Sequence, residues 1–234
     1  RLEEEEREPF YVGNTYLAYV GDNTNFGITG PLNGYRYRFQ IGKMFAEYDI
    51  STTQLDYRNY YYQNPYSFGI RALHFARYGP DENQLYDLYI GDHYYVRGYS
   101  YKSYNQNQTY GSAYKDQMNA MLGSKMGVIN AEVRLPFSGP KRLTFIQSKY
   151  FYTTLVGFFD GGFATADYKN LVFRWPWEQG WGKNSTQSTP IYSAGVALRI
   201  NLFGYAVLEP YAAIPFQRND KDITFGLFIR GSGW

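Results

Sequence analysis

The pentapeptide Tyr-Val-Arg-Gly-Tyr, at residues 95–99, lies within a long segment rich in glycine, asparagine and tyrosine, residues 81–123. This segment has no sustained periodicity, so we expect a long loop rather than one strand or one helix. Five short alternating runs follow it, and the first two each carry a lone acid, Glu132 and Asp160. A loop arginine followed by acids on the next two strands suggests a loop tucked inside a membrane β-barrel.

Outside that segment the chain alternates with a period of two, most clearly over residues 35–41, 191–202 and 223–230. Successive side chains of a strand point to opposite faces, so each run has one apolar face and one polar or small face. The sequence therefore predicts an all-β, antiparallel, up-and-down transmembrane barrel. The nine expected strands are residues 10–21, 34–45, 48–62, 66–79, 124–137, 147–164, 191–202, 205–216 and 222–232.

The lengths of these strands and of their connections favour a membrane protein. Many of the strands are about 10–13 residues long, which exceeds the usual strand of soluble sheets and suits a tilted membrane strand. Residues 201–205 form a tight turn, whereas residues 165–190 form a long connection that we expect to be extracellular. Short turns at one rim and long loops at the other are typical of outer-membrane barrels.

The charged residues of the strands share the less apolar face. That face would line a wet lumen in a barrel, and it would meet solvent in a soluble sandwich; periodicity alone does not separate the two. Its members are Arg36, Arg38, Arg58, Arg71, Arg77, Glu132, Arg134, Asp160, Arg199, Glu209 and Arg230.

Composition narrows the class of protein. Lys and Arg number 23 against 21 Asp and Glu, and the cations are scattered, so we expect no nucleic-acid partner. Aromatic residues make up 21% of the chain, which suits the aromatic girdles of an outer-membrane barrel and also a tyrosine-rich binding sandwich. There is no cysteine and no apolar run of about 18 residues. Mean hydropathy is negative, as one-sided strands allow.

Few residues suggest catalysis or metal binding. Glu132 and Asp160 could form the acid pair of a glycosidase, but only their number supports it. His74 and His93 are too isolated for a metal site, and no Gly-x-Ser-x-Gly elbow is present. We therefore expect no enzyme, no cofactor and no metal.

A cluster of tryptophans marks the long connection at 165–190. Its members are Trp175, Trp177 and Trp181. They could form a platform for glycans or a partner protein, although an interfacial aromatic cluster on an outer loop is the favoured interpretation.

From about Gly30 to Trp234 the chain resembles the C-terminal half of the BamA-type superfamily of outer-membrane β-barrels. This is the bacterial surface antigen family, which includes barrel-assembly insertases, two-partner secretion translocators and barrel-anchored surface or lipolytic proteins. The resemblance rests on the order of the elements, since each of them is weak alone. The residues similar to the family's loop motif are Val96, Arg97, Gly98 and Tyr99, and those similar to its C-terminal recognition signal are Phe225, Leu227, Ile229 and Trp234.

The resemblance implies that the loop arginine folds into the lumen and pairs with the acids of the next two strands. Carried over to this chain, Arg97 would meet Glu132 and Asp160. A guanidinium offers five donors in a fixed fork and can satisfy two carboxylates together. Gly98 would let the backbone turn tightly beside the arginine.

Barrels of this superfamily have sixteen strands, whereas this sequence predicts nine in a single domain over residues 1–234. Nine strands would not close as an even-stranded bacterial barrel, and an open edge in lipid leaves backbone groups unpaired. We therefore expect the chain to be the C-terminal part of a larger barrel. The remaining strands would lie upstream of Arg1 or come from another chain.

The function that the resemblance implies is membrane insertion or translocation of polypeptides in the bacterial outer membrane. The expected partners are the lipid bilayer, unfolded outer-membrane polypeptides and envelope assembly proteins. Two alternatives stay open. One is a membrane anchor or export barrel for an upstream soluble domain, such as a hydrolase or a β-propeller, and the other is a soluble tyrosine-rich binding sandwich.

Overall fold

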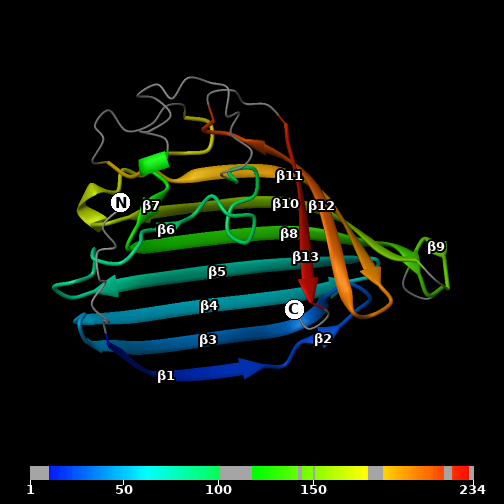
Figure 1. Ribbon diagram of the computed structural model, residues 1–234. Coiled ribbons are helices and arrows are strands. Elements are labelled where there is room, and N and C mark those ends of the chain that lie inside the picture. Colours follow the sequence, from blue (N-terminus) through cyan, green and yellow to red (C-terminus); the bar gives the residue numbers. More distant parts are fainter. Residues whose placement is uncertain are drawn as a thin grey trace, which may run out of the picture.

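The computed structural model describes residues 11–100, 118–141, 144–149, 151–178, 187–218 and 223–231. Within these residues, nine long strands form one antiparallel sheet in which each strand lies beside the next long strand of the chain (Figure 1). The long strands are β1 (Val12–Asp22), β3 (Pro31–Ala46), β4 (Ile50–Gln63), β5 (Tyr66–Tyr78), β8 (Lys125–Gly139), β10 (Tyr152–Thr165), β11 (Ile191–Leu202), β12 (Ala206–Pro215) and β13 (Thr224–Gly231).

Short elements complete the fold. β2 (Asn25–Phe26) pairs with β3, and β9 (Ile146–Gln147) pairs with β8 in parallel. β6 (Leu88–Tyr89) and β7 (Leu122–Gly123) pair with each other as a separate ladder. A 3-10 turn, η2, covers Tyr168–Asn170. In the part of the chain that the structure describes, no helix has the length and apolarity needed to cross a membrane.

The predicted all-β class and antiparallel order are confirmed, and the expected strand at 147–164 is wrong at its start. Residues Ile146–Gln147 leave the path of β10 and pair with the end of β8, where Ser138 faces Ile146. The long strand begins only at Tyr152, after the chain has turned back. Of β9, only Gln147 lay within the predicted range, and the prediction started the long strand five residues early.

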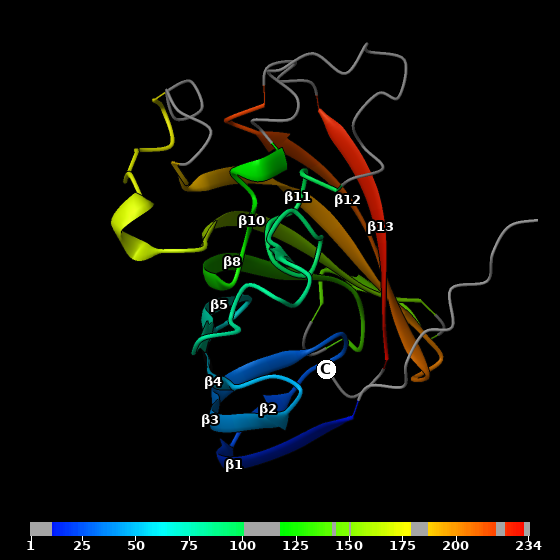
Figure 2. The ribbon, with the colours of Figure 1, turned by 60° about the vertical axis from the view of Figure 1, so that its left-hand side comes forward.

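The sheet is strongly curved, but its described strands do not close into a ring (Figure 2). Among the described residues, β1 pairs only with β3, and β13 pairs only with β12. The described residues also form no second layer that could pack on the sheet as in a sandwich, because the other ladder is the short pair β6 and β7.

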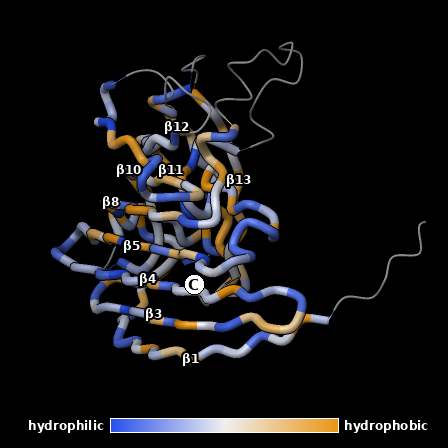
Figure 3. Tube along the Cα trace, turned by 90° about the vertical axis from the view of Figure 1, so that its left-hand side faces the viewer, coloured by the Kyte–Doolittle hydropathy of each residue, from blue (hydrophilic) through white to orange (hydrophobic). Residues whose placement is uncertain are grey.

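The register gives the sheet two different faces. Asp56, Arg71, Glu132, Asp160 and Arg199 occupy the concave face, and the residues on either side of each along its strand occupy the convex face. The alternation of hydrophilic and hydrophobic residues is visible along β3 and β5 in Figure 3. Antiparallel partners share a face, so a shift of one residue in the register of any strand would have moved its charged residues to the convex face.

The convex face is apolar and exposed. Among nine long strands, every Asp, Glu and Arg whose side chain is described lies on the concave face, and only Lys43 and Lys125 occupy convex positions, toward the ends of β3 and β8. Exposed apolar or aromatic residues of the convex face include Tyr35, Phe39, Ile41, Phe68, Ile70, Ile129, Val133, Leu155, Phe159, Val196, Ile214, Phe225, Leu227 and Ile229.

The two longest connections, residues 79–124 and 166–190, leave the same rim of the sheet. The opposite rim carries the short links 64–65 and 203–205. The described parts of 79–124 turn back from their rim and lie inside the curve of the sheet (Figure 2). This segment forms the candidate site.

Candidate functional site

The loop at 79–124 packs on the concave face through an apolar cluster. Val96 and Tyr99 are fully buried in it, as are Ile90 and Met121, whose backbones are joined by a hydrogen bond of 3.1 Å. The sheet contributes residues from four strands to the same cluster. These are Leu73, Met126, Val128, Ala164 and Ile191. The loop therefore has a core of its own against the sheet, and burial of this apolar surface favours the folded-back position.

Arg97 lies beyond this cluster and forms an ion pair with Asp160 of β10. Its Nε donates to Oδ2 at 2.7 Å and its Nη2 donates to Oδ1 at 2.8 Å, which is a bidentate pair. The backbone N–H of Arg97 donates to the same carboxylate at 3.2 Å, and Asn130 donates to it at 2.8 Å. Asp160 is fully buried, so four donors replace the water that the carboxylate lost.

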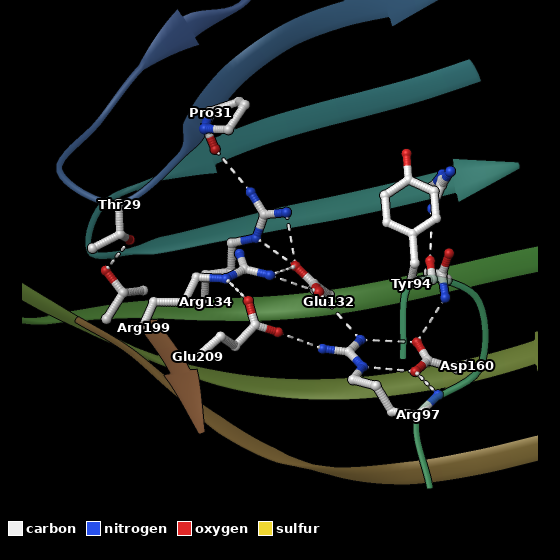
Figure 4. Close-up of polar contacts among 12 residues, drawn as sticks. Thr29, Pro31, Tyr94, Arg97, Glu132, Arg134, Asp160, Arg199 and Glu209 are labelled. Carbon is white, nitrogen blue, oxygen red and sulfur yellow. Dashed lines mark hydrogen bonds and ion pairs between the residues drawn. The ribbon is translucent and has the colours of Figure 1, made fainter. Parts of the chain in front are cut away.

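Arg97 also reaches two glutamates. Its Nη2 lies 3.2 Å from Oε1 of Glu132 on β8, and its Nη1 lies 3.1 Å from Oε1 of Glu209 on β12 (Figure 4). Glu209 is fully buried. Sequence reasoning placed Glu209 on the lumen face but not as a partner of Arg97, because only acids on the two strands after the loop were considered. The sequence feature that could have identified Glu209 as a partner is that it is the lone acid in an otherwise apolar strand.

Two further arginines complete the cluster. Arg199 of β11 bridges the glutamates, with its Nη2 at 2.9 Å from Glu132 and its Nε at 2.6 Å from Glu209. Arg134 pairs with Glu132 at 2.7 Å and donates to the carbonyl of Pro31 at 2.9 Å. We name the six residues the ion cluster: Arg97, Arg134, Arg199, Glu132, Asp160 and Glu209. Three guanidiniums and three carboxylates balance formally, which lets charges stay buried on this face.

The surroundings of Arg97, which lies in the loop and not in a strand, keep it charged. Burial opposes the charged form, but the carboxylates of Asp160, Glu132 and Glu209 outweigh this and raise the pKa of Arg97 above its ordinary value. Its guanidinium carbon lies 3.6 Å from the centre of the Phe158 ring, which adds a cation–π contact. Arg97 therefore acts as a permanent cation that holds the loop.

The residues that follow Arg97 fix the direction of the loop. Gly98 has a φ of +92°. The Tyr99 hydroxyl donates to the carbonyl of Tyr192 at 2.8 Å and accepts from the backbone N–H of Gln217 at 3.0 Å. Arg218 donates to the carbonyl of Gly98 at 3.2 Å. The motif thus binds the sheet and also the connection between β12 and β13.

Replacing Gly98 with alanine should destabilise the protein by about 1–3 kcal/mol, since a left-handed backbone is strained for other residues. The added Cβ would also lie 3.1 Å from the Cβ of Ala213. The midpoint of urea unfolding in detergent measures the change. Gly157→Ala is the matched control, because nothing lies within 4 Å of a Cβ there, and we expect it to change stability by less than about 0.5 kcal/mol. Equal midpoints for the two variants would contradict a strained role for Gly98.

The remaining predicted residues lie away from this site. Trp175 and Trp177 stack with their rings 5.3 Å apart and parallel to within 1°, and both are exposed in the 166–190 connection. Phe225, Leu227 and Ile229 form an exposed apolar row on the convex side of β13. Trp181 and Trp234, with most of the segment 101–123, lie outside the described residues.

The geometry does not suit the acid pair of a glycosidase. Asp160 is enclosed by its four donors, and Glu132 accepts from three arginines, Arg97, Arg134 and Arg199. Both carboxylates are occupied by these donors, so neither is available as the acid or the nucleophile of sugar hydrolysis while these contacts persist. His74 instead bonds with the Tyr168 hydroxyl at 2.7 Å, and His93 packs on Phe228 with ring centres 4.3 Å apart.

No protein-family model matches this chain, and no curated protein matches it. The resemblance to the BamA-type superfamily therefore depends on the residues quoted above and stays a prediction. What the structure adds is spatial: the motif arginine, Glu132 and Asp160 meet at one point on the concave face.

Proposed function

We propose that this protein is a BamA-type barrel of the bacterial outer membrane, which inserts or translocates polypeptides. The observation that carries the proposal is the contact of Arg97 with Asp160 and Glu132, on the two strands where the resemblance implies its partners. Burial of a loop cation among acids from three strands is costly unless every charge is paired. Such an arrangement suits a loop that has a fixed working position inside a lumen.

The proposal of a membrane location draws support from the convex face. A long stripe of exposed apolar side chains crosses all nine long strands, and Asp, Glu and Arg are confined to the other face wherever their side chains are described. A soluble monomer rarely exposes an apolar patch larger than a few hundred Å². Lipid tails would contact these apolar side chains directly, so the convex face would need no covering layer of protein, as in outer-membrane strands.

Val196→Arg tests the membrane location. Val196 lies midway along β11 on the convex face and is 63% exposed. A surface arginine in water changes stability by less than about 0.5 kcal/mol, whereas an arginine at the bilayer midplane costs about 2–4 kcal/mol. We expect the larger cost, measured as the shift in unfolding free energy of the protein in phospholipid vesicles.

Tyr205→Arg serves as the control for this substitution, because Tyr205 lies in the turn after β11 and is 83% exposed. It should change stability by no more than about 1 kcal/mol, as expected near an interface. If Val196→Arg were as mild as Tyr205→Arg, the convex face would not lie in lipid.

Insertion activity is tested with the protein in vesicles and a urea-unfolded β-barrel polypeptide as substrate. The folded fraction of the substrate is followed by its shift in gel mobility on heating. We expect faster folding than in empty vesicles, and loss of that gain in the Arg97→Ala variant. Substrate folding at the empty-vesicle rate in both proteins would contradict the insertase function.

One observation favours the alternative of a passive anchor or export barrel for a soluble domain. The concave face is occupied by the loop and by the ion cluster, whose members Asp160, Glu209 and Arg199 are almost completely buried. An anchor needs no open path for a polypeptide, so a filled lumen would suit it. The folding experiment separates the two functions, because an anchor leaves the substrate rate unchanged.

A further inference from the structure

A second charged group on the concave face lacks the balance of the ion cluster. Asp56 of β4 lies between Arg58 and Arg71. Nε and Nη2 of Arg58 donate to its two oxygens at 3.0 and 2.7 Å, and those of Arg71 donate at 3.2 and 3.0 Å. The three side chains are only 12–15% exposed. Two guanidiniums therefore share one carboxylate in a mostly buried setting.

Among the described residues, Asp56 is the one acid within ion-pair distance of Arg58 and Arg71. Arg38, the cross-strand neighbour of Asp56 on β3, donates its Nε to Gln40 at 3.0 Å. Among the described residues, no carboxylate lies within ion-pair distance of Arg38. Nη1 of Arg58 likewise has no hydrogen-bond partner in that part of the chain. Two mostly buried cations that share one carboxylate are only partly neutralised, so the group is complementary to an added anion.

A cavity lies beside this excess. It has a volume of about 70 Å³, and its charged lining comprises Arg58, Arg71, Arg97, Arg134 and Glu132. By the same measure a single water needs about 10–15 Å³, so the cavity has room for a small oxyanion. Arg97 and Arg134 are neutralised within the ion cluster, which leaves Arg58 and Arg71 as the source of the net positive charge.

The loop forms one wall of the cavity through Tyr94. Its hydroxyl accepts from Nη2 of Arg58 at 3.1 Å, and its carbonyl accepts from Nη1 of Arg71 at 3.0 Å. The guanidinium carbon of Arg71 lies 4.4 Å from the centre of the Tyr94 ring. The cavity is thus built jointly by β4, β5, β8 and the folded-back loop, so it depends on the position of the loop.

We propose that this cavity binds a phosphate-type oxyanion, with Arg58 and Arg71 as its principal ligands. Guanidiniums match the geometry of phosphate oxygens, and hydrogen bonds between charged groups are the strong ones. Nη1 of Arg58 donates to the anion, and the anion supplies the negative charge that Asp56 alone does not. The phosphate belongs to a free ion or to the head group of a lipid, which carry the same chemistry.

The test titrates inorganic phosphate into the delipidated full-length protein in detergent at constant ionic strength, with heat as the readout. We expect saturable binding of about one phosphate per chain, and at least tenfold weaker binding by Arg58→Gln, as the loss of a charged hydrogen bond implies. The matched control is Arg77→Gln, on the same face of β5 but six residues from Arg71, about 20 Å along the strand. Gel mobility on heating checks that both variants fold.

Two outcomes would overturn the proposal: phosphate uptake that does not saturate, or equal affinity in Arg58→Gln and the unchanged protein. The source of the phosphate is settled by phosphorus analysis of the protein before delipidation. Phosphorus that is extracted into organic solvent, and is reduced in Arg58→Gln but not in Arg77→Gln, identifies a lipid head group. If the solvent-extracted phosphorus is equal in all three proteins while saturable binding holds, the ligand is the free ion.

Discussion

Arg97→Ala should release the loop at 79–124 from the concave face while the sheet stays folded. Asp160 would lose its bidentate partner, and Glu209 would lose the contact of its Oε1 with Arg97. Removing one partner of a buried ion pair costs about 3–5 kcal/mol, because the remaining charge is uncompensated. The strands themselves keep their ladders, so the loss is local and the loop opens first.

Limited proteolysis and hydrogen exchange of the loop measure this release. We expect cleavage within the loop and faster exchange of the amides at residues 88–99, with little change in the strands. Arg38→Ala is the matched control, because Arg38 lies on the same concave face but, among the described residues, bonds to Gln40 and not to an acid. A loop that resists protease equally in both variants would refute the role of Arg97 as the residue that holds it.

Asp160→Ala should be the most damaging single change, since it removes the acceptor of four donors at a fully buried position. We expect a loss of about 3–5 kcal/mol in the free energy of unfolding. In the double variant with Arg97→Ala, the loss should be smaller than the sum of the single losses by about 0.5–3 kcal/mol, because each change removes the same contact. Urea unfolding in detergent measures all three variants.

Asp49→Ala is the control for Asp160→Ala, because it measures the loss of stability when an exposed acid is removed. The side chain of Asp49 is 60% exposed and pairs with Lys43 at the rim. Exposed pairs of this kind contribute about 0–1 kcal/mol. If Asp160→Ala cost no more than Asp49→Ala, or if the losses of Arg97→Ala and Asp160→Ala were strictly additive, the two residues would not depend on each other.

The strands were predictable because one physical rule governs them. A sheet with one apolar and one charged face imposes a period of two, and this period persists through β3, β11 and β13. The rule fails where backbone pairing changes without a change of polarity. That happens at Ile146–Gln147, which pair with β8 and not along β10.

The candidate site was predictable in part. The resemblance named Arg97, Glu132 and Asp160, and the structure brings these together. It did not name Glu209 or Arg199, whose roles depend on the curvature that carries β11 and β12 around toward the loop (Figure 2). Register and curvature are properties of the whole sheet, so a strand-by-strand analysis assigns each residue to a face without assigning its partner.

The sharing of the Asp56 carboxylate by two arginines also depends on the register of the sheet. Arg58 and Arg71 are cross-strand partners in the register of β4 and β5, and Asp56 lies two residues from Arg58 on the same face. The alternation places all three on the concave face. Only the pairing of the strands shows that two cations share one acid, and this imbalance is the basis for the proposed oxyanion site.

We propose that the convex face lies in lipid while the concave face holds the loop. The chain has no cysteine, so a spin label can be attached at one introduced cysteine at a time. The decisive measurement is label accessibility along β11 in vesicles, with convex positions Ala194, Val196 and Leu198 compared with concave positions Ser193 and Ala197. We expect collisions with dissolved oxygen to be frequent at the convex positions and rare at the concave ones, with a period of two. Convex labels that collide mainly with a water-soluble nickel chelate would contradict the claim.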